Sequence, residues 1–428
     1  MNKVTEFRYI IKEFHEFDFP KIMPRDLNIP ETSKIISIIG SRRAGKTFYF
    51  YQIIQNLLKN DISKENILYI NFEDDRLLPL EVDELNDLIE AYYELYPDSK
   101  KQKKYFFFDE IQNIKNWEIF VRRIYDKEKI KIYITGSSSK LLSKEIATSL
   151  RGRTLAFHLH PLSFNEFLKF KNIKMGKNYE YSSQRFKIKN LFEEYLNFGG
   201  FPEVALSEKL KQEILSDYYE MFIYRDLVER FSIRNTRLLK MLTKYLITNI
   251  SSIFSINSYY NSTKKEMKVS KETILEYISH LSDINLIYLV PIFSYSLKVQ
   301  QVNPSKSYCI DTGLRNAVAL KFSKDVGRLV ENIVYTELKR RGKEIFYWKN
   351  KQEIDFVIKE KNNKLTVINV NYTDEINERG IKGLQEFKKI YKSKINELLI
   401  LSKNLEEKKD GINIIPIWKW LLAPSNKK

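Results

Sequence analysis

A glycine-containing loop between an apolar segment and a helix-forming segment constrains the fold of this chain more than any other feature. Residues 40–47 read Gly-Ser-Arg-Arg-Ala-Gly-Lys-Thr and match the pattern GxxxxGK[ST] at every fixed position. Residues 34–39 predict a buried strand before the loop, and residues 48–58 predict a helix after it. A chance match is the alternative, but this strand–loop–helix context argues against it. The sequence therefore predicts a phosphate-binding loop in an α/β domain.

Each residue of the loop has an expected role. The glycines let the backbone approach a phosphate closely, and the loop N–H groups and helix N-terminus face the anion. We expect Lys46 to reach the β- and γ-phosphates and the Thr47 hydroxyl to ligate Mg²⁺. The other residues expected to line the nucleotide are Gly40, Ser41, Arg42, Arg43, Ala44, Gly45 and Phe48.

A second acidic element follows the aromatic segment 104–108, which reads as a strand buried on both faces. Asp109 would emerge at the carboxyl end of that strand and hold Mg²⁺ through water. Glu110 would polarise an attacking water, so the pair favours hydrolysis over nucleotide storage. The alternative is a helix N-terminus stabilised by two acidic residues.

The next strand-like segment, residues 131–136, leads into small hydroxyl residues that would point at the γ-phosphate. Ser137 is the candidate for sensing that phosphate, with Thr135 and Ser138 as alternatives. A simple Ser/Gly turn would also explain this composition.

Two arginines farther along are candidates for completing the site. Arg153, and after it Arg151, would neutralise transition-state charge within one chain or across a subunit boundary. Solvated surface arginines are the alternative. The oligomeric state is therefore left open, and an assembly of identical subunits remains one option.

Composition narrows the class of protein. Of 428 residues, 43% are hydrophobic and 14% aromatic, which indicates a folded chain with several cores. Cys309 is the single cysteine and there are four histidines, which argues against a disulfide framework and against a metal site built from these residues. The charged N-terminus is not a signal peptide, and the apolar run 286–293 is too short to span a bilayer. We expect a cytoplasmic protein with no membrane contact.

The net charge of +17 suits a nucleic-acid partner. The alternative is a compositional effect, because lysine is spread along the whole chain as in proteins from AT-rich genomes. DNA is therefore the first expected macromolecular partner, and protein partners are the second.

The pattern of elements predicts four domains. Alternating strands and helices over 1–160 predict a three-layer P-loop NTPase core, and 161–235 a helical lid or linker. A winged helix is expected over 236–321, and a restriction-endonuclease-like α/β domain over 322–428.

The winged-helix prediction rests on the capped helix start at 269–274, followed by Ile274, Ile278 and Leu281 at helical spacing. The outward face of this helix carries Glu272 and Glu276, which are poor for contacting phosphates. A packing module is therefore weighed against a DNA-reading helix.

In the last domain, a helix over 327–341 places Glu331 beside an apolar face formed by Val330, Val334 and Leu338. The strand 353–358 carries Asp355. The order helix, strand, strand, strand, with an acid on the helix and on the second strand, predicts the endonuclease-like core.

These motifs, taken in order, resemble a known family. SRRAGKT, FFFDEIQNI, ITGSSSKLL, RGRT, HPLSFNEFL, NFGGFPEV, YRDL, CIDTGL, GRLVENIVYTEL and EIDFVI are similar to the archaeal-type AAA+ ATPases. That resemblance implies ATP (or ADP) binding, Mg²⁺-dependent hydrolysis and a cytoplasmic location. It assigns ATP-site roles to Gly40, Gly45, Lys46, Thr47, Asp109 and Glu110.

One departure concerns the endonuclease-like site. The family pattern has a helix Glu, a strand Asp, and an acid and a lysine on the next strand. Glu331 and Asp355 match the first two, but Asn369 and Asn371 stand where the acid and the lysine are expected. Asparagine supplies neither the charge nor the proton-transfer group.

The sequence therefore predicts a DNA-associated ATPase whose nuclease-like domain does not cut DNA. The alternatives are a nucleotide-controlled switch that scaffolds protein partners and an active ATP-coupled nuclease.

Overall fold

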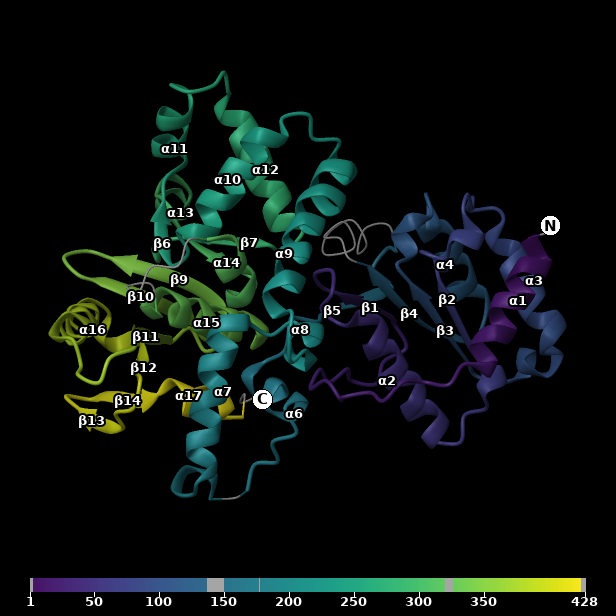
Figure 1. The fold of residues 1–428 in the computed structure, drawn as a ribbon, viewed down its shortest axis with the longest axis horizontal. Helices are drawn as coiled ribbons and strands as arrows, with labels where there is room; N and C mark the ends of the chain where they lie inside the picture. The colour runs from purple at the N-terminus through teal and green to yellow at the C-terminus, as the bar shows by residue number, and fades with distance from the viewer. Residues whose placement is uncertain (1–2, 137–149, 177, 320–325, 425–428) are drawn as a thin grey trace. The chain divides into compact units, whose positions relative to one another are not determined.

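The computed structural model describes residues 3–136, 150–176, 178–319 and 326–424 (Figure 1). The chain forms two compact units, residues 1–160 and residues 161–428. The division of residues 161–428 into a helical linker, a winged helix and a nuclease-like domain stays a prediction. Within the described ranges no helix is both long enough and apolar enough to cross a membrane.

Unit 1 is built on a five-stranded parallel sheet with the order β2-β3-β4-β1-β5 (Figure 1). Its inner strand β3 is buried at every position, as the run of aromatic residues predicts. The strands are β1 (Ile35–Ile39), β2 (Ile67–Asn71), β3 (Lys104–Asp109), β4 (Ile130–Gly136) and β5 (Thr154–His158).

Helices cover both faces of this sheet. One apolar cluster joins α1, α3 and α4 to one face, and a second joins α2 to the other. The result is a mixed α/β core of three layers. The helices are α1 (Lys3–Glu16), α2 (Lys46–Lys59), α3 (Leu85–Leu95) and α4 (Trp117–Lys127).

Unit 2 begins with helices that pack around a glycine turn. Helix α7 ends where Gly199 adopts a positive φ of 72°, and the next residue, Gly200, donates its N–H to Asp311 at 2.7 Å. Helix α9 then widens into a π-helix. The elements are α6 (Phe164–Phe170), α7 (Gln184–Phe198), α8 (Pro202–Leu206), α9 (Lys211–Met221) and the π-helix (Phe222–Glu229).

The middle of unit 2 contains a small antiparallel sheet with the order β6-β8-β7. Ser270 caps helix α12, and Ile274, Ile278 and Leu281 are buried, as the helical spacing predicts. The elements in chain order are α10 (Thr236–Thr248), β6 (Ser252–Phe254), α11 (Ile256–Thr263), α12 (Lys271–Asp283), β7 (Ile287–Val290), α13 (Leu297–Val302) and β8 (Ser305–Cys309).

The end of unit 2 is a six-stranded mixed sheet with the order β13-β14-β12-β11-β10-β9. The strands are β9 (Glu344–Lys349), β10 (Glu353–Lys359), β11 (Leu365–Asn371), β12 (Ile395–Ser402), β13 (Glu407–Lys409) and β14 (Ile412–Pro416). The accompanying helices are α14 (Thr312–Val318), α15 (Val326–Arg340), α16 (Glu378–Tyr391) and α17 (Ile417–Leu422).

Short 3-10 turns occur in both units. They lie at Lys64–Asn66, Asp75–Leu77, Pro97–Lys101, Ile111–Asn113, Tyr179–Tyr181 and Lys392–Lys394.

Candidate functional site

The phosphate loop lies between β1 and α2 and requires both of its glycines. Gly45 precedes α2 with a φ of 93°, a left-handed conformation that a side chain rarely adopts. A Cβ atom at Gly40 would lie 2.2 Å from the carbonyl oxygen of Leu159. The loop therefore has the backbone geometry that the GxxxxGK[ST] pattern predicts.

Asp109 ends strand β3, and α2 begins after strand β1. Both strands pair with β4 in parallel, so Asp109 and the start of α2 lie at the same edge of the sheet. The Thr47 hydroxyl donates to Asp109 Oδ2 at 2.6 Å, and Tyr69 donates to the same oxygen at 3.1 Å. The Thr135 hydroxyl donates to Asp109 Oδ1. Asp109 is fully buried, and burial together with the adjacent Glu110 carboxylate raises the pKa of Asp109 above its ordinary value.

Glu110 points at the phosphate loop from a left-handed backbone conformation (φ 51°). Lys46 Nζ lies 3.2 Å from Glu110 Oε1, and the Gln112 amide donates to Glu110 Oε2 at 2.6 Å. Burial would raise the pKa of Glu110, but Lys46, Gln112 and Arg42 outweigh it, and the pKa lies below its ordinary value. Glu110 is therefore a carboxylate at neutral pH.

The donor set fits a hard divalent cation. Thr47 and Asp109 place a hydroxyl and a carboxylate oxygen within hydrogen-bond distance of each other, and Mg²⁺ prefers oxygen ligands of this kind. Lys46 also donates to the carbonyl of Ser41 at 3.4 Å, so its ammonium stays at the mouth of the loop.

The structure does not bring the two candidate arginines to the phosphate loop of their own unit. Arg153 precedes β5 and makes a bidentate pair with Asp126 at 2.8 and 3.0 Å. Its carbonyl accepts from Ile35 N, at the amino end of the sheet, whereas the loop lies at the carboxyl end. Arg151 is exposed. A role for either arginine across a subunit boundary stays a prediction.

Thr135 is the hydroxyl that the structure places at the acidic pair. Besides donating to Asp109, its oxygen accepts the N–H of Glu110 at 3.0 Å, and Thr135 is fully buried. The sequence favours Ser137 over Thr135 for this role, but Ser137 and Ser138 lie outside the described residues. The sequence feature that could have favoured Thr135 is its position within the buried strand, because the strand fixes the direction of its side chain.

Arg25 contacts the phosphate loop, a contact that was not predicted from the sequence. Its guanidinium donates to the carbonyl of Ala44 at 2.8 Å and to that of His160 at 2.7 Å, and Arg25 is buried. No local pattern marks it, because the residues that it joins are far apart in the sequence.

Comparisons with known proteins identify the family of this chain. Residues 32–168 match an AAA domain, residues 189–325 a domain of unknown function (DUF8612), and residues 326–420 another (DUF4143). The uncharacterized protein MJ1544 of Methanocaldococcus jannaschii is 42% identical over 420 residues, covering 94% of this chain and 92% of that protein. The chain belongs to this family of AAA-domain proteins.

Other members and structures extend the comparison. An uncharacterized protein of Haemophilus influenzae is 32% identical, covering 92% of this chain and 96% of its own length. The Aeropyrum pernix Orc1 protein solved with DNA covers 74% of this chain and 91% of its own, at 12% identity and a TM-score of 0.30. AMPPCP-bound DnaA of Aquifex aeolicus covers 58% and 81%, at 14% identity and a TM-score of 0.24. These two likenesses are too weak to carry an argument about this AAA-domain protein.

In unit 2 of this AAA-domain protein, one of the two asparagines of the nuclease-like pattern, Asn369, is hydrogen-bonded to Asp355. Asn369 Oδ1 accepts the N–H of Asp355 at 3.0 Å, and Asn369 Nδ2 donates to Gly380 O at 3.1 Å. Asn371 turns away and donates to the carbonyl of Glu375 at 2.8 Å. Both asparagine side chains therefore hydrogen-bond to backbone groups.

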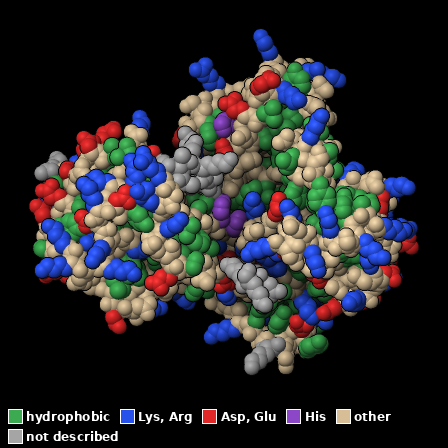
Figure 2. Space-filling view, turned by 180° about the vertical axis from the view of Figure 1, so that it is seen from behind, with side chains coloured by type: hydrophobic (Ala, Val, Ile, Leu, Met, Phe, Trp, Pro, Cys, Tyr) green, Lys and Arg blue, Asp and Glu red, His purple; other side chains and the backbone are tan. Residues whose placement is uncertain are grey.

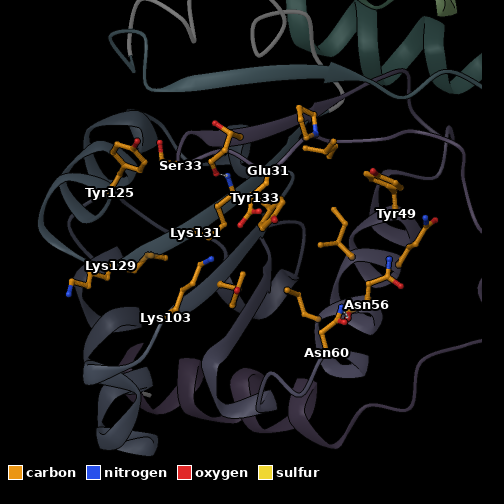
Figure 3. Close-up of a pocket in the computed structure, with 18 of the residues that line it drawn as sticks. Glu31, Ser33, Tyr49, Asn56, Asn60, Lys103, Tyr125, Lys129, Lys131 and Tyr133 are labelled. Carbon is orange, nitrogen blue, oxygen red and sulfur yellow. Dashed lines mark hydrogen bonds between the residues drawn. The ribbon is translucent and has the colours of Figure 1, made fainter. Parts of the chain in front are cut away.

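A large hollow of about 1480 Å³ lies in unit 1, away from the phosphate loop. Figure 3 shows Lys103, Lys129 and Lys131 on one side of it, and α2 residues on the other. Burial and the nearby Lys103 lower the pKa of Lys131 to about 8. The lining tyrosines are Tyr49, Tyr105, Tyr125 and Tyr133. The hollow thus combines amines with aromatic rings.

Proposed function

We propose that unit 1 hydrolyses ATP. The observation that carries this proposal is the hydrogen bond between Thr47 and Asp109, because it joins the phosphate loop to the acidic strand end in a single site. The Lys46–Glu110 ion pair places the phosphate-binding cation and the water-polarising carboxylate at the same point. Adenine as the base is proposed from the family likeness alone.

In the proposed reaction Lys46 exchanges its carboxylate partner for the β- and γ-phosphates. Glu110 is then released to orient a water molecule and accept its proton, which its lowered pKa favours over a protonated resting state. Thr135 holds both Asp109 and the Glu110 backbone in place during this exchange. Mg²⁺, when bound, would screen the phosphate charge, and Thr47 and Asp109 would hold it.

We also propose that DNA is the partner of this ATPase. The net charge of +17 supports a polyanionic partner. On the face shown in Figure 2, Lys and Arg side chains lie among Asp and Glu and do not form one stripe. The charge distribution on this face therefore does not identify a DNA-binding surface. The hollow of Figure 3 supplies lysines beside tyrosines, the combination that binds single-stranded nucleic acid.

Two acidic residues of the hollow are already neutralised within unit 1. Asp126 pairs with Arg153, and Glu128 lies 3.6 Å from Lys104. The lining also includes Asp26 and Glu31, and the Lys131 ammonium donates to the carbonyl of Thr32 at 2.6 Å. Lys103 and Lys129 are therefore the lysines proposed to meet a phosphate backbone.

We propose a winged helix for the middle of unit 2 and a nuclease-like domain without cleavage activity for its end. The order α10, β6, α11, α12, β7, α13, β8 with an antiparallel three-stranded sheet supports the first. The acidic outward face of α12 favours a packing role over DNA reading. The backbone-bound Asn369 and Asn371 support the second.

The test is ATP hydrolysis by the full chain with Mg²⁺, with and without single-stranded, duplex or branched DNA, at low and moderate salt. Lys46→Ala is the blank. Several-fold stimulation by one DNA form, lost in Lys103→Ala/Lys129→Ala, supports the DNA proposal. Slow hydrolysis that no DNA changes would favour the protein-scaffolding switch. The absence of any hydrolysis above the Lys46→Ala blank would overturn the ATPase proposal itself.

A further inference from the structure

Three acidic side chains of unit 2 share one ammonium group. Lys306 Nζ, from strand β8, lies 2.9 Å from Glu331 Oε1 of helix α15. The same Nζ lies 2.8 Å from Glu353 Oε1 and 2.9 Å from Asp355 Oδ1, both on strand β10. The Lys306 side chain is 1% exposed, so these three carboxylates are its surroundings.

Two of these acidic side chains accept a further hydrogen bond. Tyr308 donates to Glu331 Oε1 at 2.7 Å, and the N–H of Val370 donates to Asp355 Oδ2 at 2.9 Å. One oxygen of each of the three acidic side chains therefore lies within 2.9 Å of a single centre, as oxygen ligands lie around a cation. The atom at that centre is the Lys306 nitrogen.

We propose that the Lys306 ammonium is the permanent cation of this site and occupies the place of a divalent metal ion. The arrangement needs no metal, because a charge of the right sign already lies within hydrogen-bond distance of each carboxylate. Lys306 therefore closes the nuclease-like site to metal-dependent chemistry.

The cluster borders a space through which an ion could enter. A pocket of about 340 Å³ is lined by Glu353 and Asp355 together with Asn369 and Asn371. If the ammonium were removed, the carboxylates would lose their counter-charge while keeping a route to solvent. Glu331 is buried, Asp355 is half-buried and Glu353 is exposed. Loss of the ammonium would leave their negative charge without a partner, and we expect a divalent cation to take its place. Lys306→Ala should thus open a divalent-cation site that the natural chain does not offer.

The experiment measures Mn²⁺ binding by calorimetry on the full chain without nucleotide. The proteins are the natural chain, Lys306→Ala, Lys306→Ala/Asp355→Asn and Asp355→Asn. We expect Lys306→Ala to bind one more Mn²⁺ than the natural chain, and Lys306→Ala/Asp355→Asn to lose it. The phosphate loop is the same in all four proteins, so its contribution cancels. The inference would be overturned if the natural chain held a Mn²⁺ that Asp355→Asn alone removed.

A second measurement keeps the inference testable if Lys306→Ala folds poorly. Lys306→Ala leaves space for an ion, whereas Lys306→Met fills that space with an apolar chain. Circular dichroism should show that Mn²⁺ restores folding, or raises the melting temperature, of Lys306→Ala and not of Lys306→Met. Equal responses of the two variants to Mn²⁺, including no response from either, would also overturn it. The outcome is independent of ATP hydrolysis, so it can fail while the proposed function holds.

Discussion

Units 1 and 2 each contain a lysine beside acidic side chains, and the two lysines differ in how tightly they are held. Lys46 has one carboxylate partner, Glu110, at 3.2 Å. Lys306 has three, at 2.8 to 2.9 Å, and is more deeply buried. The first lysine can exchange its partner for an incoming phosphate, whereas the second would have to abandon a complete set of contacts.

The backbone explains part of this difference. Lys46 is the first residue of α2, next to a left-handed glycine at the helix N-terminus, where N–H groups face an anion. Lys306 lies within a strand that is paired on both edges, with β6 and with β7. A lysine in a phosphate loop suits a transient ligand, and a lysine in a central strand suits a permanent ion pair.

The largest expected effect tests the exchangeable lysine. Lys46→Ala should reduce hydrolysis to background and weaken ATP binding by about 10- to 100-fold, because a charged hydrogen bond contributes about 1.5–3 kcal/mol. Calorimetry with ATP and a phosphate-release assay would measure both. Lys59→Ala, at the exposed end of the same helix, is the control and should behave like the natural chain. Tight ATP binding by Lys46→Ala would contradict the assignment of the loop.

The next prediction separates binding from chemistry at the same ion pair. Glu110→Gln should keep ATP binding but slow hydrolysis by about 10²- to 10⁴-fold, since a positioned general base contributes this much. Single-turnover kinetics at saturating ATP would measure the rate. Unchanged turnover would remove Glu110 as the residue that polarises water and would weaken the comparison with Lys306.

A third prediction concerns the permanent pair. Lys306→Ala, in metal-free buffer, should lower the free energy of unfolding of unit 2 by about 3–5 kcal/mol, because it removes the buried ammonium that three acidic side chains share. Lys343→Ala is the matched control. It removes a partly exposed pair with Glu360 at 2.7 Å and should cost about 1 kcal/mol or less. Urea denaturation would measure both losses. Equal losses would show that the Lys306 ion pairs contribute no more to stability than the partly exposed pair of Lys343.

The smallest effect is a pH dependence. Burial and Asp355 raise the pKa of Glu331 to about 8, from an ordinary value of 4.5. Between these values the folded chain holds a proton that the unfolded chain releases, so the contribution of Glu331 to stability falls as pH rises.

Glu331→Gln removes this dependence while keeping an oxygen that can accept from Lys306 and Tyr308. Relative to Glu331→Gln, the natural chain should lose about 1 kcal/mol of stability between about pH 6 and about pH 7. Urea denaturation at both pH values would measure the difference. A constant difference between the two proteins would contradict a raised pKa.

The sequence predicts one of these sites far better than the other. Gly40, Lys46 and Thr47 belong to one short pattern, and Asp109 follows a strand whose burial its aromatic residues make evident. The strand register then brings these residues together without further information.

Lys306 was missed because its partners are 25 to 49 residues away and lie on other elements. Only the chain's path in space brings β8 to α15 and β10. A signal was nevertheless present. Lys306 and Tyr308 share one face of a strand otherwise made of Ser and Cys, where a charge is unexpected.

The close approach of Gly40 to Leu159 has a consequence for communication along the chain. Leu159 N donates to Ile39 O at 2.7 Å, and Arg25 joins Ala44 of the phosphate loop to His160. His160 is the last residue of unit 1, and Pro161 begins unit 2. The phosphate loop is therefore in contact with the last two residues before the junction of the units, with Leu159 directly and with His160 through Arg25, so a change in the loop on binding phosphate would act first on Leu159 and His160.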